Sequence, residues 1–103
     1  MNPLVQIINQ VFEIRHKITE AGNAASFERN FNRLNSILEE AGFIVQDPTG
    51  EAYLESRTDC EASISGSLAP KMKIVKTLKP VVYKKEGNTV QLVQKAVVIV
   101  EKS

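Results

Sequence analysis

The first helix that the sequence predicts is apolar over more of its circumference than one partner helix can cover. Asn2 and Pro3 predict its start, because asparagine caps a helix and proline needs no hydrogen-bond donor in the first turn. Its apolar residues recur at helical spacing and are Leu4, Val5, Ile7, Ile8, Val11, Phe12, Ile14 and Ile18. A helix with so wide an apolar face must pack against more than one other element.

A second, narrower amphipathic helix follows after a short turn. Gly22 predicts the end of the first helix and Gly42 the end of the second, because glycine readily adopts the left-handed conformation that closes a helix. The apolar residues of the second helix alternate at spacings of four and three and are Phe27, Phe31, Leu34, Leu38 and Ala41. We therefore expect residues 1–42 to form an antiparallel helical hairpin.

Such a hairpin, standing alone, would leave part of the apolar face of its first helix in water. Association of two copies into a four-helix bundle would bury that face, so we expect a homodimer. The interface residues that we expect are Leu4, Ile8, Val11 and Phe12 of the first helix and Phe31, Leu34 and Leu38 of the second.

Strand patterns and turns replace helical spacing after Gly42. The sequence DPTG at residues 47–50 predicts a turn, because proline fixes one backbone angle and glycine permits a positive one. Strand patterns cover residues 43–45, 60–65, 72–79, 81–83, 89–93 and 96–100. Pro80 interrupts strand pairing, and the polar residues 84–88 suit a hairpin loop.

The last strand pattern, residues 96–100, is apolar on both of its faces, so we expect it at the centre of a small sheet. Residues 43–103 should thus form a small β-rich domain behind the helical hairpin of residues 1–42. The chain as a whole is expected to belong to the α+β class.

The composition indicates a globular protein without a membrane-spanning segment. Hydrophobic residues make up 43% of the 103 residues, yet no apolar run approaches the roughly 18 residues of a membrane span. The N-terminus lacks the basic flank of a secretory signal, and the single cysteine, Cys60, cannot form an internal disulfide. We therefore expect a cytoplasmic location and no membrane partner.

Charge is divided unevenly along the chain. Residues 1–69 carry 10 acidic and 5 basic side chains, whereas residues 70–103 carry 8 basic and 2 acidic ones. A basic segment can attract nucleic acid, but only Tyr83 lies among these lysines as a surface on which a base could stack. Cross-strand pairing and protection of strand edges explain the lysines more simply, so we expect no nucleic-acid partner.

No group of side chains has the spacing of a catalytic or metal site. His16 is the only histidine and has no second ligand near it in sequence, so a solvated helix residue is the simpler interpretation. Cys60 has no neighbouring base to activate it, so we expect a small buried strand residue. Asp59 and Glu61 would face the same way on a strand and could bind a cation, although ordinary surface acids are the more frequent case. We therefore expect no catalytic residue, no metal and no cofactor, and a protein-binding role rather than an enzyme.

Three segments of the chain resemble GrpE, the nucleotide exchange factor of DnaK-type chaperones. Residues 42–53, GFIVQDPTGEAY, match the family's segment of a helix-ending glycine, apolar residues, a D-P-x-G-E turn and an aromatic residue. Residues 60–62, CEA, match the last two positions of its H-E-A signature. Residues 92–100 are similar to the family's final strands.

The sequence departs from that family at identifiable positions. Cys60 stands in place of the signature histidine, and Gln94 and Lys95 stand where the family has arginine and proline. No counterpart of the family's long leading helix precedes Asn2 in this sequence, so we expect a reduced relative or a piece of a longer protein.

The resemblance implies a homodimeric four-helix bundle that carries small β domains. It also implies that the β domain binds the nucleotide-binding domain of a DnaK-type chaperone and favours its open state, so that nucleotide leaves sooner. Glu61, Gln94 and Lys95 occupy signature positions and are the implied partner contacts. The alternative is a GrpE-shaped dimeric adaptor without exchange activity, because a shared fold does not secure a shared function.

Overall fold

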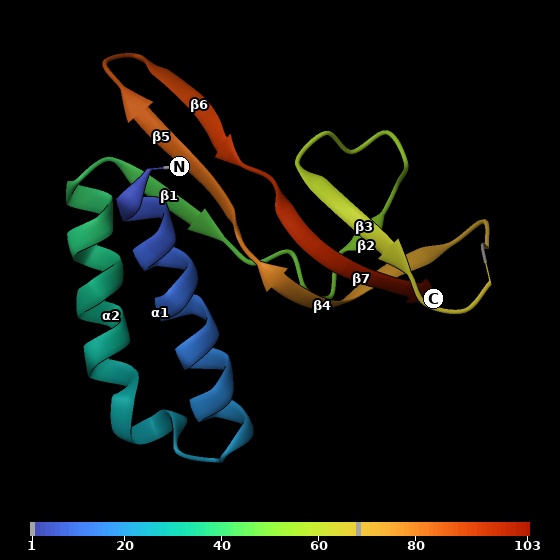
Figure 1. Ribbon diagram of the computed structural model, residues 1–103, viewed down its shortest axis with the longest axis horizontal. Coiled ribbons are helices and arrows are strands. Elements are labelled where there is room, and N and C mark those ends of the chain that lie inside the picture. The colour runs from blue at the N-terminus through green and yellow to red at the C-terminus, as the bar shows by residue number, and fades with distance from the viewer. Residues whose placement is uncertain (1, 68) are drawn as a thin grey trace.

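Within the residues it describes, 2–67 and 69–103, the computed structural model consists of two helices followed by seven strands (Figure 1). The strands form two separate sheets. Neither of the described helices is long and apolar enough to cross a membrane. The predicted α+β class, a helical hairpin followed by a β-rich half, is confirmed.

The first helix begins where the sequence predicts, and both helices end where it predicts. α1 (Pro3–Glu20) starts after Asn2, whose side-chain oxygen accepts a 2.9 Å hydrogen bond from a backbone N–H of the first turn. α2 (Ala24–Glu40) runs back beside it (Figure 1). Gly22 and Gly42 follow the two helices with φ angles of 79° and 90°, the left-handed conformation that glycine adopts without steric cost.

The strands divide into a three-stranded and a four-stranded sheet. The first has the order β1-β5-β6, with bounds β1 (Phe43–Gln46), β5 (Val81–Glu86) and β6 (Thr89–Gln94). The second has the order β2-β4-β7-β3, with bounds β2 (Ala52–Tyr53), β4 (Met72–Lys79), β7 (Ala96–Lys102) and β3 (Cys60–Ile64). Neighbouring strands are antiparallel except β3 and β7, which run parallel.

The chain passes from one sheet to the other at two adjacent points. Pro80 alone separates β4 from β5, and Lys95 alone separates β6 from β7. Proline has no N–H to donate to a strand ladder, so pairing breaks at Pro80 as the sequence predicts. The two resulting arms, β4–β5 and β6–β7, run side by side and pass from sheet to sheet together (Figure 1).

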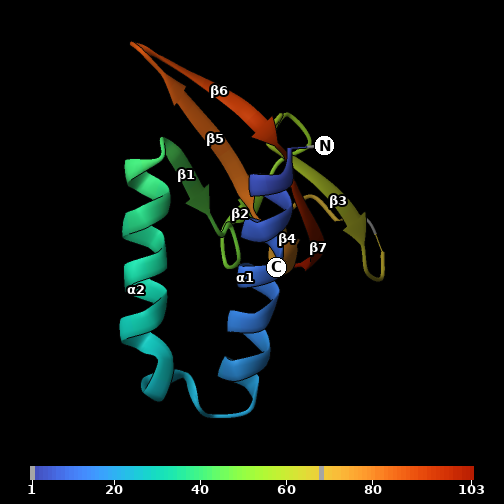
Figure 2. The same ribbon diagram turned by 60° about the vertical axis from the view of Figure 1, so that its left-hand side comes forward.

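The turn between β5 and β6 is tighter than predicted. Only Gly87 and Asn88 lie between the two strands, and residues 84–86 continue β5 instead of forming a loop. Gly87 has a φ of 61°, which suits a two-residue hairpin turn. Polar side chains are compatible with a strand where both faces of the sheet are open to solvent. The β5–β6 hairpin is therefore longer than predicted, and it projects from the rest of the chain (Figure 2).

A bulge changes which residues of β4 face the core. The sequence alternation groups Leu78 with Met72 and Ile74, but the pairing of β4 with β7 shifts register between Ile74 and Lys76. An extra residue in one strand reverses the faces beyond it. As a result Thr77 is buried, whereas the Leu78 side chain is 48% exposed.

β7 lies inside its sheet, between β4 and β3, as the sequence predicts. Ala96, Val98 and Val100 are fully buried on one face. Val97 and Ile99 on the other face are half-buried, so cover on that face is partial.

All the buried apolar residues except Phe31 of α2 form two clusters. The first joins α1 to the β1-β5-β6 sheet and consists of Val5, Ile8, Phe43 and Val82, with Leu38 and Val45 at its border. The second belongs to the four-stranded sheet, with Val81 of β5, and consists of Cys60, Met72, Ile74, Val81, Ala96, Val98 and Val100. The first cluster draws residues from both sides of the expected domain boundary at residue 42. The chain's own sheet therefore covers part of the wide apolar face of α1.

Replacing Phe43 with alanine should lower the free energy of unfolding by about 3–5 kcal/mol, because a fully buried aromatic ring would leave a cavity between the hairpin and the sheet. Leu54→Ala, at an exposed apolar residue outside the helical hairpin, is the control and should cost less than about 1 kcal/mol. Urea denaturation followed by circular dichroism measures both. Equal costs for the two variants would contradict a shared core at Phe43.

Candidate protein-binding surface

Two of the three expected partner contacts lie near each other at one end of the second sheet. β3 and β7 pair in parallel with Cys60 opposite Ala96, and the backbone N–H of Ala96 donates a 2.9 Å hydrogen bond to the carbonyl of Asp59. Glu61 is the next residue along β3, and Lys95 immediately precedes β7, so they lie at the starts of adjacent strands. Both are exposed.

The third expected contact, Gln94, is committed to bonds within the chain. Its amide nitrogen donates to the carbonyl of Pro80 at 2.9 Å and to the side-chain oxygen of Asn9 at 2.8 Å. Its amide oxygen accepts a 2.9 Å bond from the side-chain nitrogen of Asn9. Gln94 thereby ties α1 to the point where the chain passes between the sheets, and a partner could use its amide only by displacing these bonds.

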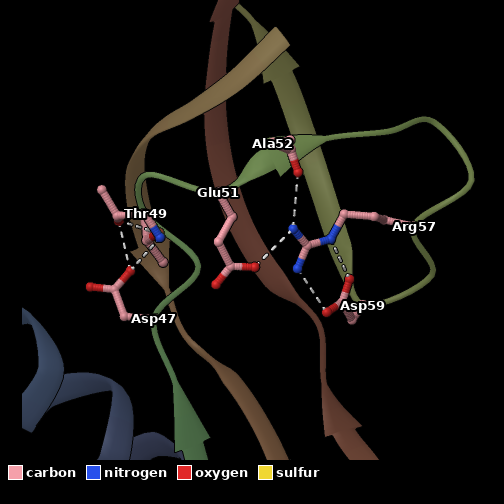
Figure 3. Close-up of polar contacts among 7 residues, drawn as sticks. Asp47, Thr49, Glu51, Ala52, Arg57 and Asp59 are labelled. Atoms are coloured by element: carbon pink, nitrogen blue, oxygen red, sulfur yellow. Dashed lines mark hydrogen bonds and ion pairs between the residues drawn. The ribbon is translucent and has the colours of Figure 1, made fainter. Parts of the chain in front are cut away.

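A polar cluster centred on Arg57 holds the loop that leads into β3 (Figure 3). The Nε and Nη2 atoms of Arg57 each donate a 3.0 Å hydrogen bond to a carboxylate oxygen of Asp59. Its Nη1 atom donates to the Glu51 carboxylate at 3.1 Å and to the Ala52 carbonyl at 3.2 Å. Two parallel bonds are the strongest arrangement of an arginine and a carboxylate, so this cluster fixes the start of β3 and with it Glu61.

Arg57 occupies both carboxylate oxygens of Asp59, one of the two acids that the sequence places two residues apart with Glu61. The hydrogen bonds from Arg57 lower the pKa of the Asp59 carboxyl below its ordinary value of 3.8, and partial burial only partly opposes this. Nowhere in residues 2–67 and 69–103 do three or more potential His, Cys, Asp or Glu ligands gather as a metal site. The sequence signal that would have revealed the cluster is the R-x-D spacing of Arg57 and Asp59 within one polar loop.

Cys60 begins β3 as a buried residue of the second core cluster, as its strand pattern predicts. Burial raises the pKa of its thiol, and the nearby charge of Arg57 only partly offsets that effect. A thiol whose pKa is raised holds little thiolate at neutral pH, which disfavours a role as nucleophile.

The DPTG turn forms a second polar cluster, between α1 and β4 (Figure 3). The backbone N–H and the hydroxyl of Thr49 donate to Asp47, and this hydroxyl also lies 2.7 Å from that of Thr77. Partial burial acts to raise the pKa of Asp47, but these hydrogen bonds and His16 outweigh it, so the pKa lies below its ordinary value. The His16 ring lies 3.5 Å from Asp47, so the histidine docks α1 on this turn rather than standing free in solvent.

The expected dimer-interface residues fall into three groups. Ile8 and Phe31 are buried within the single chain. Val11, Phe12 and Leu38 are half-buried and line a groove of about 370 Å³ between the two helices. Leu4 and Leu34 are exposed, and so are further apolar residues of the hairpin, namely Ile7, Ile14, Phe27 and Ile37.

The comparisons with known proteins give no match. The chain fits no protein-family model, and it has no significant similarity to any curated protein or to any solved structure.

Replacing Asp59 with asparagine should lower the free energy of unfolding at neutral pH by about 1–2 kcal/mol, because it removes a charged, doubly bonded partner of Arg57. Because folding lowers the pKa of Asp59, its contribution is present above the ordinary value of 3.8 and is lost as the pH falls through the lowered pKa. Urea denaturation at a series of pH values should therefore show the two proteins converging in acid. The exposed Glu55→Gln serves as the control, and a wild-type advantage that persists unchanged in acid would refute this account.

Proposed function

We propose that this protein is a GrpE-like co-chaperone that binds the nucleotide-binding domain of a DnaK-type chaperone and promotes release of its nucleotide. The observation that carries the proposal is the position of Glu61 and Lys95. They come from two separate segments that resemble GrpE, and they lie exposed at the starts of adjacent strands. Such residues can contact one partner together.

Exchange of this kind needs no covalent chemistry. A protein that binds the open form of a nucleotide-binding domain more tightly than the closed form shifts the chaperone toward the open form. The opposite charges of Glu61 and Lys95 would select a partner surface with the complementary pattern. The Arg57 cluster holds the start of β3 in place before binding, which reduces the entropy lost on association.

We further propose that the hairpin joins two copies of the chain. Apolar side chains remain exposed on both helices after packing within one chain, and they include Leu4, Ile14, Leu34 and Ile37. Exposed apolar residues grouped on one element mark an interaction site more often than scattered ones do. A four-helix bundle would bury them and would present two β-rich halves to partners.

A second candidate is a GrpE-shaped dimeric adaptor without exchange activity. Two signature positions serve the chain's own fold, because Gln94 is bonded to Asn9 and Pro80 and Cys60 is buried. This observation favours a protein that keeps the shape of an exchange factor while binding a different partner.

Addition of the protein should accelerate release of a fluorescent nucleotide from a DnaK-type chaperone. Charge reversal by Glu61→Lys or Lys95→Glu should weaken the acceleration by about three- to tenfold, since each leaves a partner charge unpaired. Lys71→Glu, an exposed lysine elsewhere in the basic half, is the matched control and should have little effect.

The result separates the two candidates when binding is measured in the same samples. Chaperone binding without faster release would favour the adaptor. A folded protein that neither binds the chaperone nor changes release would refute the co-chaperone proposal.

Leu34→Glu should convert a dimer into a monomer, because it places a charge on the exposed apolar surface of α2. Leu54→Glu, an exposed leucine outside the hairpin, should leave the association unchanged. Sedimentation equilibrium measures the mass of each variant. A monomeric wild-type protein, or a dimer that withstands Leu34→Glu, would contradict association through the hairpin.

A further inference from the structure

β6 (Thr89–Gln94) forms an open edge of the first sheet. Among the described residues it pairs with β5 on one side and with no strand on the other. A strand with one free side presents a row of backbone N–H and C=O groups to solvent, and these groups can pair with another extended chain. The β5–β6 hairpin projects from the body of the protein, so this free side is accessible (Figure 2).

Apart from a bulge at its C-terminal end, where Val93 is an extra residue opposite β5, this edge lacks the features that usually protect a strand edge. Its sequence, TVQLVQ, contains no charge, no proline and no glycine, and every residue except the last is exposed. The other edge strands differ, since β2 has two residues, β1 has four and β3 carries the charged Glu61. β6 is therefore the longest uncharged edge in the described part of the chain.

The two faces beside this edge have different chemistry. Leu92 lies opposite Tyr83 and Val90 opposite Lys85. These four side chains therefore share the sheet face that is directed away from the two helices. Val90 is 53% exposed and Leu92 is 39% exposed. Gln91 and Thr89 occupy the other face. An added strand would therefore meet apolar neighbours on one face and polar neighbours on the other.

The charge around the edge indicates which sequences fit. Lys85 lies on β5 beside β6 and Lys95 follows the end of β6, while Glu86 is the one acid among residues 81–95. The amine of Lys84 is turned away from this edge, because it donates a 2.9 Å hydrogen bond to the Ala41 carbonyl. The exposed Lys85 and Lys95 side chains repel positive charge nearby, so an added strand rich in lysine or arginine is disfavoured and one carrying acidic residues is favoured.

We propose that the free edge of β6 binds an extended, acidic segment of another protein, which adds as a fourth strand with its apolar side chains beside Val90 and Leu92. Backbone hydrogen bonds would supply affinity and the alternating side chains specificity. A second copy of this chain is a poorer occupant, because pairing two β6 edges would bring two lysine-rich hairpins together. This site lies on the β5–β6 hairpin, and the proposal does not depend on a chaperone partner.

A fluorescein-labelled peptide in which valine alternates with threonine, with glutamates at both ends, tests the proposal by fluorescence anisotropy. The peptide should bind the full chain, and versions with terminal lysines or with a central proline should bind at least about tenfold more weakly. Leu92→Glu should weaken binding by about tenfold or more, because it removes an apolar neighbour of the added strand and places there a charge that repels the glutamates of the peptide. Leu78→Glu on β4 is the matched control and should bind like the wild type.

Amide hydrogen exchange of the wild-type protein gives a test that needs no variant. Amides among residues 89–94 that exchange freely without peptide should become protected when the acidic peptide is added. Three results would overturn the proposal: no binding of the acidic peptide, equal binding of the lysine peptide, or protection confined to the two helices. Protection of residues 89–94 that rises with protein concentration in the absence of peptide would overturn it in favour of a second copy.

Discussion

The relative placement of the two sheets depends on how the chain passes between them at Pro80 and Lys95. The buried Pro80 cannot donate to either ladder, and its carbonyl would lack a strand partner without Gln94. Gln94 supplies that donor and also exchanges two hydrogen bonds with Asn9 of α1. One amide side chain thus joins the first helix, the end of β6 and the break between β4 and β5. Gln94 and Asn9 are half-buried, and the hydrogen bonds between them and to the Pro80 carbonyl favour one arrangement of these elements.

The candidate protein-binding surface follows from that arrangement. β7 leaves the crossing directly after Lys95 and accepts β3 as a parallel neighbour, which places Glu61 beside the start of β7. A parallel pair needs a crossover connection rather than a tight turn, so nothing local in the sequence fixes where β3 starts. The bidentate contact between Arg57 and Asp59 fixes the start of β3, because it closes the loop immediately before Cys60.

The chain is too small to bury all of its apolar surface. Its core is split into two modest clusters, one beneath α1 and one within the second sheet. Two parts of the uncovered remainder are the outer sides of the helical hairpin and the β5–β6 hairpin, and Leu54, Ile64, Val75 and Leu78 are exposed elsewhere. These surfaces differ in kind, since helices present side chains alone, whereas the edge of β6 also presents backbone groups. They therefore suit different partners, a second hairpin in one case and an extended strand in the other.

Local chemistry in the sequence determined the helices, the glycines that end them, the DPTG turn, the break at Pro80 and the buried position of Cys60. Each depends on the preferences of a few consecutive residues, or on a repeat that matches one kind of element. Only the tertiary structure decided the rest. The bulge in β4 buried Thr77 in place of Leu78, because pairing with β7 and not local alternation sets the register. Gln94 was turned inward because Asn9 and the Pro80 carbonyl, both distant in sequence, come within hydrogen-bonding reach of it. The excess apolar face of α1 was visible in the sequence, but which part the sheet would cover was not, because that depends on how strands far along the chain pair beneath the helix.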